Sequence, residues 1–398
     1  MSRAPAERGR SLGPVLLAVL VDLLGFGLVI PLLSFYAEEF GAGPVQVTLL
    51  MACYSLAQFV FAPLWGQLSD RIGRRPVMLV SIAGTALTLA GFAAAPTLAW
   101  LFVFRTLNGI CAANISTAQA YVADITTPEN RARGMGLIGA SFGLGFTLGP
   151  FFGGELSRFG LSVPIWLAAA LAAVNFVWAL FGLPESRPVG GRAKVERTLD
   201  PLAMLKVLRH PAVGLTITLA FVATSAFAMM EGTFSLVAEH RWGMDAGHVG
   251  RMFGLIGVIG ILIQGGLIGR LVKRFGEPSL VASGYALNAA GLVALAFAPA
   301  GPAVWAGCTL IALGTSLANP SLNSLISRGA GEDDQGGVLG VNQSLGALGR
   351  AVGPTAGGLL YTHWFAGGGF LTAGVMMFGA LFLSFPAARR ALAGRALA

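Results

Sequence analysis

Two long apolar runs near the start of the chain are separated by a strongly charged stretch. Val45–Trp65 and Val77–Ala95 each approach the roughly 20 apolar residues that a helix needs to cross a bilayer. The stretch between them, Gly66–Pro76, carries four charges in eleven residues, which hydrocarbon does not accommodate. We therefore expect two membrane-spanning helices joined by a tight turn at the membrane surface, and the three arginines of the turn indicate the cytoplasmic side.

The charged turn recurs later in the chain, where Gly269–Pro278 repeats Gly66–Pro76 at a displacement of 203 residues. A second pattern, the glycines and proline of Gly136–Gly154, repeats as Gly340–Gly358 at a displacement of 204 residues. The matched residues of the turn are Gly66 and Gly269, Arg71 and Arg274, and Gly73 and Gly276. Two separate repeats at nearly one offset indicate a duplicated architecture with two halves related by a parallel repeat, an arrangement that transporters use.

Apolar runs of this kind fill the whole chain. Hydrophobic residues make up 55% of it and charged residues only 11%, whereas soluble proteins carry roughly 25% charged residues. We expect an all-α membrane protein of twelve transmembrane helices in two pseudo-twofold-related six-helix bundles. The expected spans are residues 13–37, 45–68, 77–95, 98–124, 133–158, 162–183, 211–238, 247–269, 279–299, 302–327, 336–362 and 367–387.

One connection is longer than the others. Residues 184–210 are polar and contain three prolines, so we expect an N-terminal six-helix bundle in residues 1–183, a cytoplasmic linker in residues 184–210 and a C-terminal six-helix bundle in residues 211–398. Of the 26 lysines and arginines, 21 fall in the termini or in loops that the alternation of spans assigns to the cytoplasm. The net charge of +8 therefore reflects membrane topology and not nucleic-acid binding. We expect a multi-pass protein of a bacterial inner membrane with both termini in the cytoplasm.

The sequence contains no catalytic or metal-binding pattern. Cys53, Cys111 and Cys308 lie in apolar runs without metal-ligand spacing, and the four histidines accompany no serine, thiol or acid arrangement typical of catalysis. We expect no enzyme activity, no cofactor and no metal. The expected partners are a small-molecule substrate, protons and the lipid bilayer, and we expect the chain to act as a monomer.

Three stretches carry a resemblance to a known family: Val21–Pro31 in the first span, the Gly66–Pro76 turn, and Gly139–Pro150 in the fifth span. The chain resembles the major facilitator superfamily over essentially its full length, and it is most similar to the twelve-helix drug:proton antiporters that include the tetracycline efflux pumps. The resemblance implies two bundles that expose a central site to each side of the membrane in turn. It also implies export, because the glycine–proline pattern of the fifth span is more typical of exporters than of importers.

Asp22 lies in the middle of the first span. A carboxylate at this depth costs at least about 2.5–3.5 kcal/mol on insertion scales, so we expect its side chain to face the interior of the bundle. Burial favours the protonated form, so the group can bind and release a proton near neutral pH, as a proton-coupled carrier requires. The alternative is a structural acid that pairs with a neighbouring polar group.

Further charges lie inside expected spans: Arg105, with Asn108 one turn later, in the fourth, Glu231 in the seventh and Arg350 in the eleventh. The Arg105 guanidinium cannot deprotonate, so it needs an anion, water or carbonyl groups inside the protein. By resemblance, Arg105 corresponds to an arginine that takes part in proton transfer, while helix packing is the alternative. We assign proton coupling to Asp22, Arg105 and Glu231, and we assign the substrate cavity to Asp22, Arg105, Asn108, Glu231 and Arg350.

The charged turn and the end of the fourth span form a candidate cytoplasmic gate. Asp70 can accept hydrogen bonds from the electropositive start of the eleventh helix, and Arg71 or Arg74 can pair with Asp124. By resemblance, this cluster closes the cytoplasmic side in the outward-facing state. The alternative is a solvated charge cluster worth less than about 1 kcal/mol per exposed pair. The residues assigned to the gate are Gly66, Asp70, Arg71, Gly73, Arg74 and Asp124.

Glycines form a long strip along the fifth span. The absence of side chains permits close contact between helices, and a proline within the strip favours a bend. We therefore expect a helix-packing hinge on which the two halves slide or rock. The residues assigned to it are Gly143, Gly145, Gly149, Pro150 and Gly153.

Three positions depart from the tetracycline pumps that the chain resembles. Where the shared motifs are aligned, Thr88 and Asn288 replace acids and Gly260 replaces a histidine. These departures argue against tetracycline itself as the substrate.

We expect a secondary transporter that exports small amphipathic organic compounds or drugs in exchange for protons by alternating access. The sequence has no phosphate-binding loop, so an ion gradient has to supply the energy. One alternative is a proton-coupled symporter that imports an anion or metabolite drawn by Arg105 and Arg350. Another is a membrane receptor or scaffold that does not transport.

Overall fold

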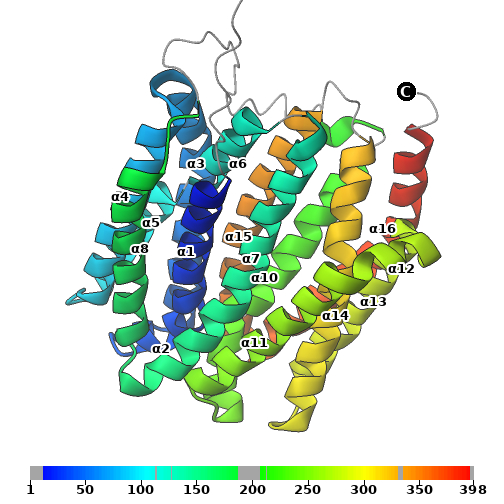
Figure 1. Cartoon of the computed structure of the whole chain (residues 1–398). Coiled ribbons are helices and arrows are strands. Elements are labelled where there is room, and N and C mark those ends of the chain that lie inside the picture. The colour runs from blue at the N-terminus through cyan, green and yellow to red at the C-terminus, as the bar shows by residue number, and fades with distance from the viewer. Residues whose placement is uncertain are drawn as a thin grey trace, which may run out of the picture.

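The computed structural model describes residues 12–112, 114–126, 128–186, 207–211, 213–329 and 335–394. In these residues every regular element is helical, and the long helices run side by side in one bundle (Figure 1). The helices of the N-terminal half are α1 (Gly13–Val29), η1 (Ile30–Leu32), α2 (Leu33–Glu38), α3 (Pro44–Ile72), α4 (Arg74–Ala93), α5 (Leu98–Cys111), α6 (Asn114–Ile125), α7 (Pro128–Leu156), η2 (Ser157–Phe159) and α8 (Val163–Gly182). Those of the C-terminal half are α10 (Gly214–Trp242), α11 (Ala246–Leu262), the π-helical turn η3 (Ile263–Leu267), α12 (Ile268–Phe275), α13 (Glu277–Phe297), α14 (Pro302–Gly329), α15 (Gln335–His363) and α16 (Gly368–Gly394).

Grouped by continuity, the described helices cross the bundle twelve times, the number that the sequence predicts. The first pass combines α1, η1 and α2, the fourth combines α5 and α6, and the eighth combines α11, η3 and α12. Nine stretches of the described chain are long and apolar enough to cross a membrane. The boundaries of the linker expected at residues 184–210 stay a prediction, because residues 187–206 lie outside the described ranges.

The charged turn is shorter than the sequence predicts. α3 continues through the expected turn to Ile72, and α4 begins at Arg74, so a single residue, Gly73, reverses the chain. Its φ of +104° lies in the region that glycine adopts without a steric penalty. Gly276, with a φ of +76°, makes the equivalent reversal between α12 and α13. We call the end of the bundle that carries these two reversals the turn end, and the opposite end the far end.

The helix packing follows the duplicated sequence. In the N-terminal half α1 packs against α7 and α4 packs against α8, and in the C-terminal half α10 packs against α15 and α13 against α16, which are the equivalent pairs. Between the halves, the two extensive contacts are α7 with α11 and α3 with α15. These two contacts exchange places when the halves are interchanged, as pseudo-twofold symmetry requires.

Each half has its own apolar interior. In the C-terminal half the rings of Phe234, Trp242 and Phe370 lie together, with Phe234 and Trp242 at 5.7 Å between centroids. In the N-terminal half Tyr121 and Met78 are fully buried near the turn end. These aromatic and aliphatic contacts hold the helices of a half together. Apolar contacts also cross between the halves, since Leu32 and Phe35 pack in the cluster of the C-terminal half and Leu236 packs in a cluster of the N-terminal half.

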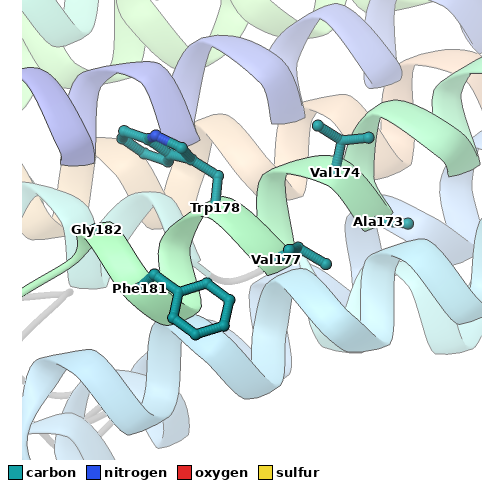
Figure 2. A pocket seen from close by; sticks show the side chains of 6 residues that line it. All are labelled: Ala173, Val174, Val177, Trp178, Phe181 and Gly182. Atoms are coloured by element: carbon teal, nitrogen blue, oxygen red, sulfur yellow. The ribbon is translucent and has the colours of Figure 1, made fainter.

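The outer surface carries exposed apolar side chains, as a lipid-facing surface does. A shallow hollow of about 660 Å³ lies on the outer face of α8. Figure 2 shows the side chains that line it. Val174 is 66% exposed and Phe181 is 84% exposed, while Trp178 forms one side of the hollow. Because none of the lining side chains carries a charge, we interpret this face as lying against acyl chains and not as a site for chemistry.

Candidate functional site

Asp22 lies inside the N-terminal half, on the part of α1 that packs against α7 and α8. One of its carboxyl oxygens is fully buried, and the Asn175 side chain of α8 lies within hydrogen-bonding reach of the carboxyl group. The Asn175 amide also donates to the Ala18 carbonyl oxygen at 3.1 Å, which fixes its orientation. The mid-span acid therefore faces the protein and not lipid, next to a neutral polar group that suits either protonation state.

Arg105 of α5 is 3% exposed and lies against aromatic rings. The centre of its guanidinium is 4.4 Å from the Tyr54 ring centroid and 5.7 Å from that of Phe26. Its Nε has no hydrogen-bond partner among the described residues, so the ring faces supply part of the stabilisation that water would give. Phe26 lies one turn after Asp22 on α1, so the helix that carries the acid also supplies one of the rings that cover Arg105.

A cavity of about 220 Å³ lies between the halves near the middle of the helices. Glu231 of α10 and Arg350 of α15 both line it, and Phe146 of α7 closes it on the side of the N-terminal half. Glu231 also interacts electrostatically with Arg105, so the aromatic-covered arginine lies close behind the cavity wall. The remaining lining residues are Ala223, Thr224, Phe227, Ala228, Asn288, Leu292, Ile311, Thr315, Asn319 and Met377.

Asn108 does not line this cavity, although the sequence places it there. Its side chain is 5% exposed, and its amide donates to the Thr88 hydroxyl oxygen at 2.9 Å, within the N-terminal half. Asn108 lies on the face of α5 that meets α4, and the adjacent Gly109 lets the backbone of Tyr54 approach α5 closely. In the described structure helix packing turns the Asn108 side chain toward a neighbouring helix, and its assignment to the substrate cavity stays a prediction.

Arg74 is the centre of the charge cluster at the turn end. Its side chain is 6% exposed and pairs with Asp70 at 2.6 Å and with Asp124 at 3.2 Å. Its guanidinium also donates to the Ser69 hydroxyl at 2.5 Å. The sequence predicts that Arg71 or Arg74 pairs with Asp124. In the structure Arg74 forms this ion pair, while Arg71 is exposed. The described side-chain partners of Arg74 all belong to the N-terminal half, so in this conformation the cluster connects helices of that half.

Glu185, which sequence reasoning missed, completes this cluster. Its carboxylate accepts hydrogen bonds from the backbone N–H groups of Arg74 at 2.9 Å and Arg75 at 3.1 Å, so it caps the start of α4. A Cβ atom at Gly73 would lie 2.5 Å from a Glu185 carboxylate oxygen, so this position admits only glycine. Gly66, by contrast, has no atom within 4 Å of a Cβ position among the described residues, so its assignment to the gate stays a prediction.

The C-terminal half contains the same ion pair with its charges exchanged. Displacing Arg74 by 203 residues leads to Glu277, and displacing Asp124 by 204 residues leads to Arg328. The Glu277 carboxylate lies 2.8 Å from the Arg328 guanidinium and accepts a hydrogen bond from the Ser324 hydroxyl at 2.8 Å. The repeat offset relates this pair to Arg74 and Asp124 in the sequence, although the charges have opposite signs.

We expect the Arg74→Gln variant to lose about 2 kcal/mol of stability, less than the 3–5 kcal/mol typical of a fully buried pair because Asp124 is 24% exposed. The loss arises because Asp70 and Asp124 are left without their shared cation. Thermal melting in detergent measures it. Arg71→Gln removes the same charge from an exposed position of the same turn and is the control; equal melting temperatures for both variants would contradict the prediction.

The glycine strip of α7 divides into faces with different neighbours. Gly145, Gly149 and Gly153 lie against α1, and a Cβ atom at Gly149 would lie 2.6 Å from the Gly27 Cα. These three residues therefore pack two helices of the same half, and not the two halves against each other as predicted. Gly143 has no atom within 4 Å of its Cβ position in the described structure, so its assignment to a packing hinge stays a prediction.

The contact between the halves on α7 is made by a neighbouring face of the helix. A Cβ atom at Gly154 would lie 2.7 Å from the Ala246 carbonyl oxygen, and one at Gly250 would lie 2.5 Å from the Pro150 carbonyl oxygen. Backbone meets backbone at these two positions, and further along the seam the Phe151 and Thr147 side chains of α7 pack against Gly254 and Gly257 of α11. Of the predicted hinge residues, Pro150 is the one that lies on this seam.

Polar contacts between the halves gather at the far end. The Ser235 hydroxyl of α10 donates to the Pro31 carbonyl oxygen at 3.2 Å. His240 lies 3.6 Å from the Glu38 carboxylate of α2, and its other ring nitrogen lies 2.9 Å from the Tyr361 hydroxyl. Together with the glycine seam of α7 and α11, these contacts close the far end.

Known proteins similar to this chain match it over almost its whole length. A family model described as Major Facilitator Superfamily matches residues 15–354 and 267–396. The tetracycline resistance protein, class C, of Escherichia coli is 34% identical over 348 residues, which cover 85% of this chain and 87% of that protein. Multidrug resistance protein 2 of Bacillus subtilis (strain 168) is 29% identical over 351 residues, which cover 86% of each.

A solved structure gives the same result at the level of the fold. The crystal structure of the human organic anion transporter MFSD10 (TETRAN) matches with a TM-score of 0.73 and 29% sequence identity. The match covers 96% of this chain and 100% of that chain. The likeness therefore extends to the arrangement of both halves and is not confined to the charged turn or the glycine strip.

Proposed function

Because the chain belongs to the Major Facilitator Superfamily, we propose that it is a proton-coupled secondary transporter that exports small amphipathic organic compounds by alternating access. The names of similar proteins support export of such compounds, since they include a tetracycline resistance protein and a multidrug resistance protein. The observation that carries proton coupling is Asp22, whose carboxyl group is buried inside the N-terminal half beside Asn175. A buried acid in the membrane is a functional site by default, because its insertion is costly.

The proposed mechanism couples the charge of Asp22 to the conformation of the protein. A proton taken up by Asp22 from one side removes a buried negative charge, and its release on the other side restores it. α1 transmits this change, since it carries Asp22 and also Phe26, whose ring covers Arg105 behind the cavity wall. The halves rock about the seam of α7 and α11, where glycines of both helices bring the two backbones into close contact.

We further propose that the turn end faces the cytoplasm of a bacterial cell and that the chain works as a monomer in the inner membrane. Arginines concentrate at the turn end, as the positive-inside rule predicts for the cytoplasmic side. On this orientation, the closed far end faces outward, and the conformation described here is the inward-facing one. The cluster around Arg74 is then available to contact α15 when the turn end closes.

Transport by purified protein in proteoliposomes tests the proposal. Norfloxacin, ethidium and tetracycline are each added outside vesicles with an acidic interior, and we expect accumulation of at least one of the first two together with proton efflux reported by trapped pyranine. Vesicles without a pH gradient are the control. Uptake that requires an acidic exterior would instead identify a symporter, and binding without flux would identify a receptor; either result would overturn the proposal.

A further inference from the structure

The central cavity presents two opposite charges that the protein leaves without direct partners. Glu231 and Arg350 line it together, and they interact electrostatically. No nitrogen–oxygen distance of 4.0 Å or less joins them, and neither makes a hydrogen bond with another described residue. Both side chains keep part of their surface toward the cavity, so both charges are available to a ligand.

Arg105 is not available in the same way. Its guanidinium is covered by the rings of Tyr54 and Phe26, and its side chain is almost completely buried. Of the two arginines inside the membrane, Arg350 is therefore the one that a ligand in the cavity can contact. Its guanidinium offers five N–H groups and matches the geometry of a carboxylate.

The rest of the cavity wall is mainly apolar. Phe227, Leu292 and Met377 supply hydrophobic surface, while the Asn288 carbonyl oxygen is engaged by the Thr315 hydroxyl at 3.1 Å. The cavity has a volume of about 220 Å³ in this conformation. Such a wall selects an amphipathic molecule in which charges occupy defined places.

We infer that the cavity binds a zwitterionic amphipathic compound, with its anionic group on Arg350 and its cationic group on Glu231. This inference rests on the proposed function, in which the cavity is the substrate site. A cation alone leaves Arg350 unpaired inside the membrane, and an anion alone leaves Glu231 unpaired next to a second negative charge. A ligand with both charges pairs both side chains, and buried charges are favourable only when they are paired.

Four compounds with one scaffold test this inference by binding to the detergent-purified full chain at pH 7.5. They are 4-(aminomethyl)benzoic acid, its methyl ester as the cation, its N-acetyl derivative as the anion, and the N-acetyl methyl ester as the neutral form. We expect the zwitterion to bind at least ten-fold more tightly than either singly charged compound. Equal binding of the cation or of the anion would overturn the inference.

Two variants locate the charges. The Arg350→Gln variant should bind the zwitterion no more tightly than it binds the cation, because only the contact with Glu231 remains. The Glu231→Gln variant should bind the zwitterion no more tightly than it binds the anion, because only the contact with Arg350 remains. Arg158→Gln and Glu39→Gln make the same changes at exposed positions and should keep the order of the four affinities. Melting temperatures establish that each variant is folded, and an unchanged order in both cavity variants would overturn the inference.

The double variant Glu231→Arg/Arg350→Glu separates pairing from folding. It keeps both charges in the cavity with their places exchanged, so we expect it to regain the preference for the zwitterion that each single variant loses. No pH gradient is used in these measurements. A preference for the zwitterion without proton-driven flux would therefore refute the proposed transport and leave the binding site standing, and proton-driven flux without the preference would refute the inference alone.

Discussion

The Asp22→Asn variant is expected to lose proton-driven transport, with an initial rate at least about 100-fold below that of the unchanged protein, the effect typical of removing a positioned proton-transfer group. Asparagine has nearly the same shape as aspartic acid and can still bond to Asn175, so the fold is retained. It cannot bind and release a proton, however, so the two conformations no longer differ in their affinity for protons. Substrate uptake and proton movement are measured together in proteoliposomes with an imposed pH gradient.

An exchange measurement identifies the step that Asp22→Asn blocks. Exchange of labelled for unlabelled substrate without a pH gradient should persist, because the amide mimics the protonated carboxyl group and substrate binding is unaffected. Glu39→Gln, which neutralises an exposed acid at the far end, is the control for loss of a negative charge. Proton movement by the Asp22→Asn variant at the rate of the unchanged protein would show that another group carries the proton.

The Gly149→Val variant is expected to disrupt the N-terminal half. The first atom of the new side chain would lie 2.6 Å from the Gly27 Cα, and the obstacle is backbone that cannot rotate away. Overpacking costs about 1–3 kcal/mol where side chains can adjust, so we expect a loss at or above the top of that range here. The melting temperature in detergent and the yield of monodisperse protein measure the effect.

Gly143→Val is the matched control for this steric effect. It makes the same substitution two turns earlier in α7 and so changes helix propensity to the same extent, but its Cβ position has no atom within 4 Å in the described structure. We expect its melting temperature to stay close to that of the unchanged protein. A similar loss for both variants would mean that helix propensity and not the contact with α1 causes the destabilisation.

The repeat was the most informative part of the sequence, because it concerns local features that a chain encodes directly. Gly73 and Gly276 reverse the chain at equivalent places, as their spacing predicts. The turn predicted from the sequence is longer than the observed one, because the charged residues before Gly73 remain helical. They lie at the surface, where water solvates them as well as it would in a loop. The exchanged ion pair of Glu277 and Arg328 follows from the same offset.

Side-chain direction was less predictable, because a helix displays residues on every face and only its neighbours decide which face is inside. Asn108 turned out to bond to Thr88, and Gly145 and Gly149 contact α1, although both are on a strip that looked like an interface between the halves. The sequence does not predict the contact of Tyr54 with Arg105, since a tyrosine in a long apolar run has no distinctive pattern. Its position over Arg105 depends on how α3 and α5 approach each other.

The sequence by itself determined that this chain crosses a membrane many times in two related halves, and that a few charges lie within the spans. It could do so because the thickness of the bilayer sets the length that an apolar span needs. A charged side chain inside the bilayer is costly, so charges within a span are rare and mark functional positions. Only the tertiary structure decided that Glu231 and Arg350 share one cavity while Arg105 is covered by aromatic rings. Those relations join residues between 51 and 119 positions apart, and packing between separate helices creates them.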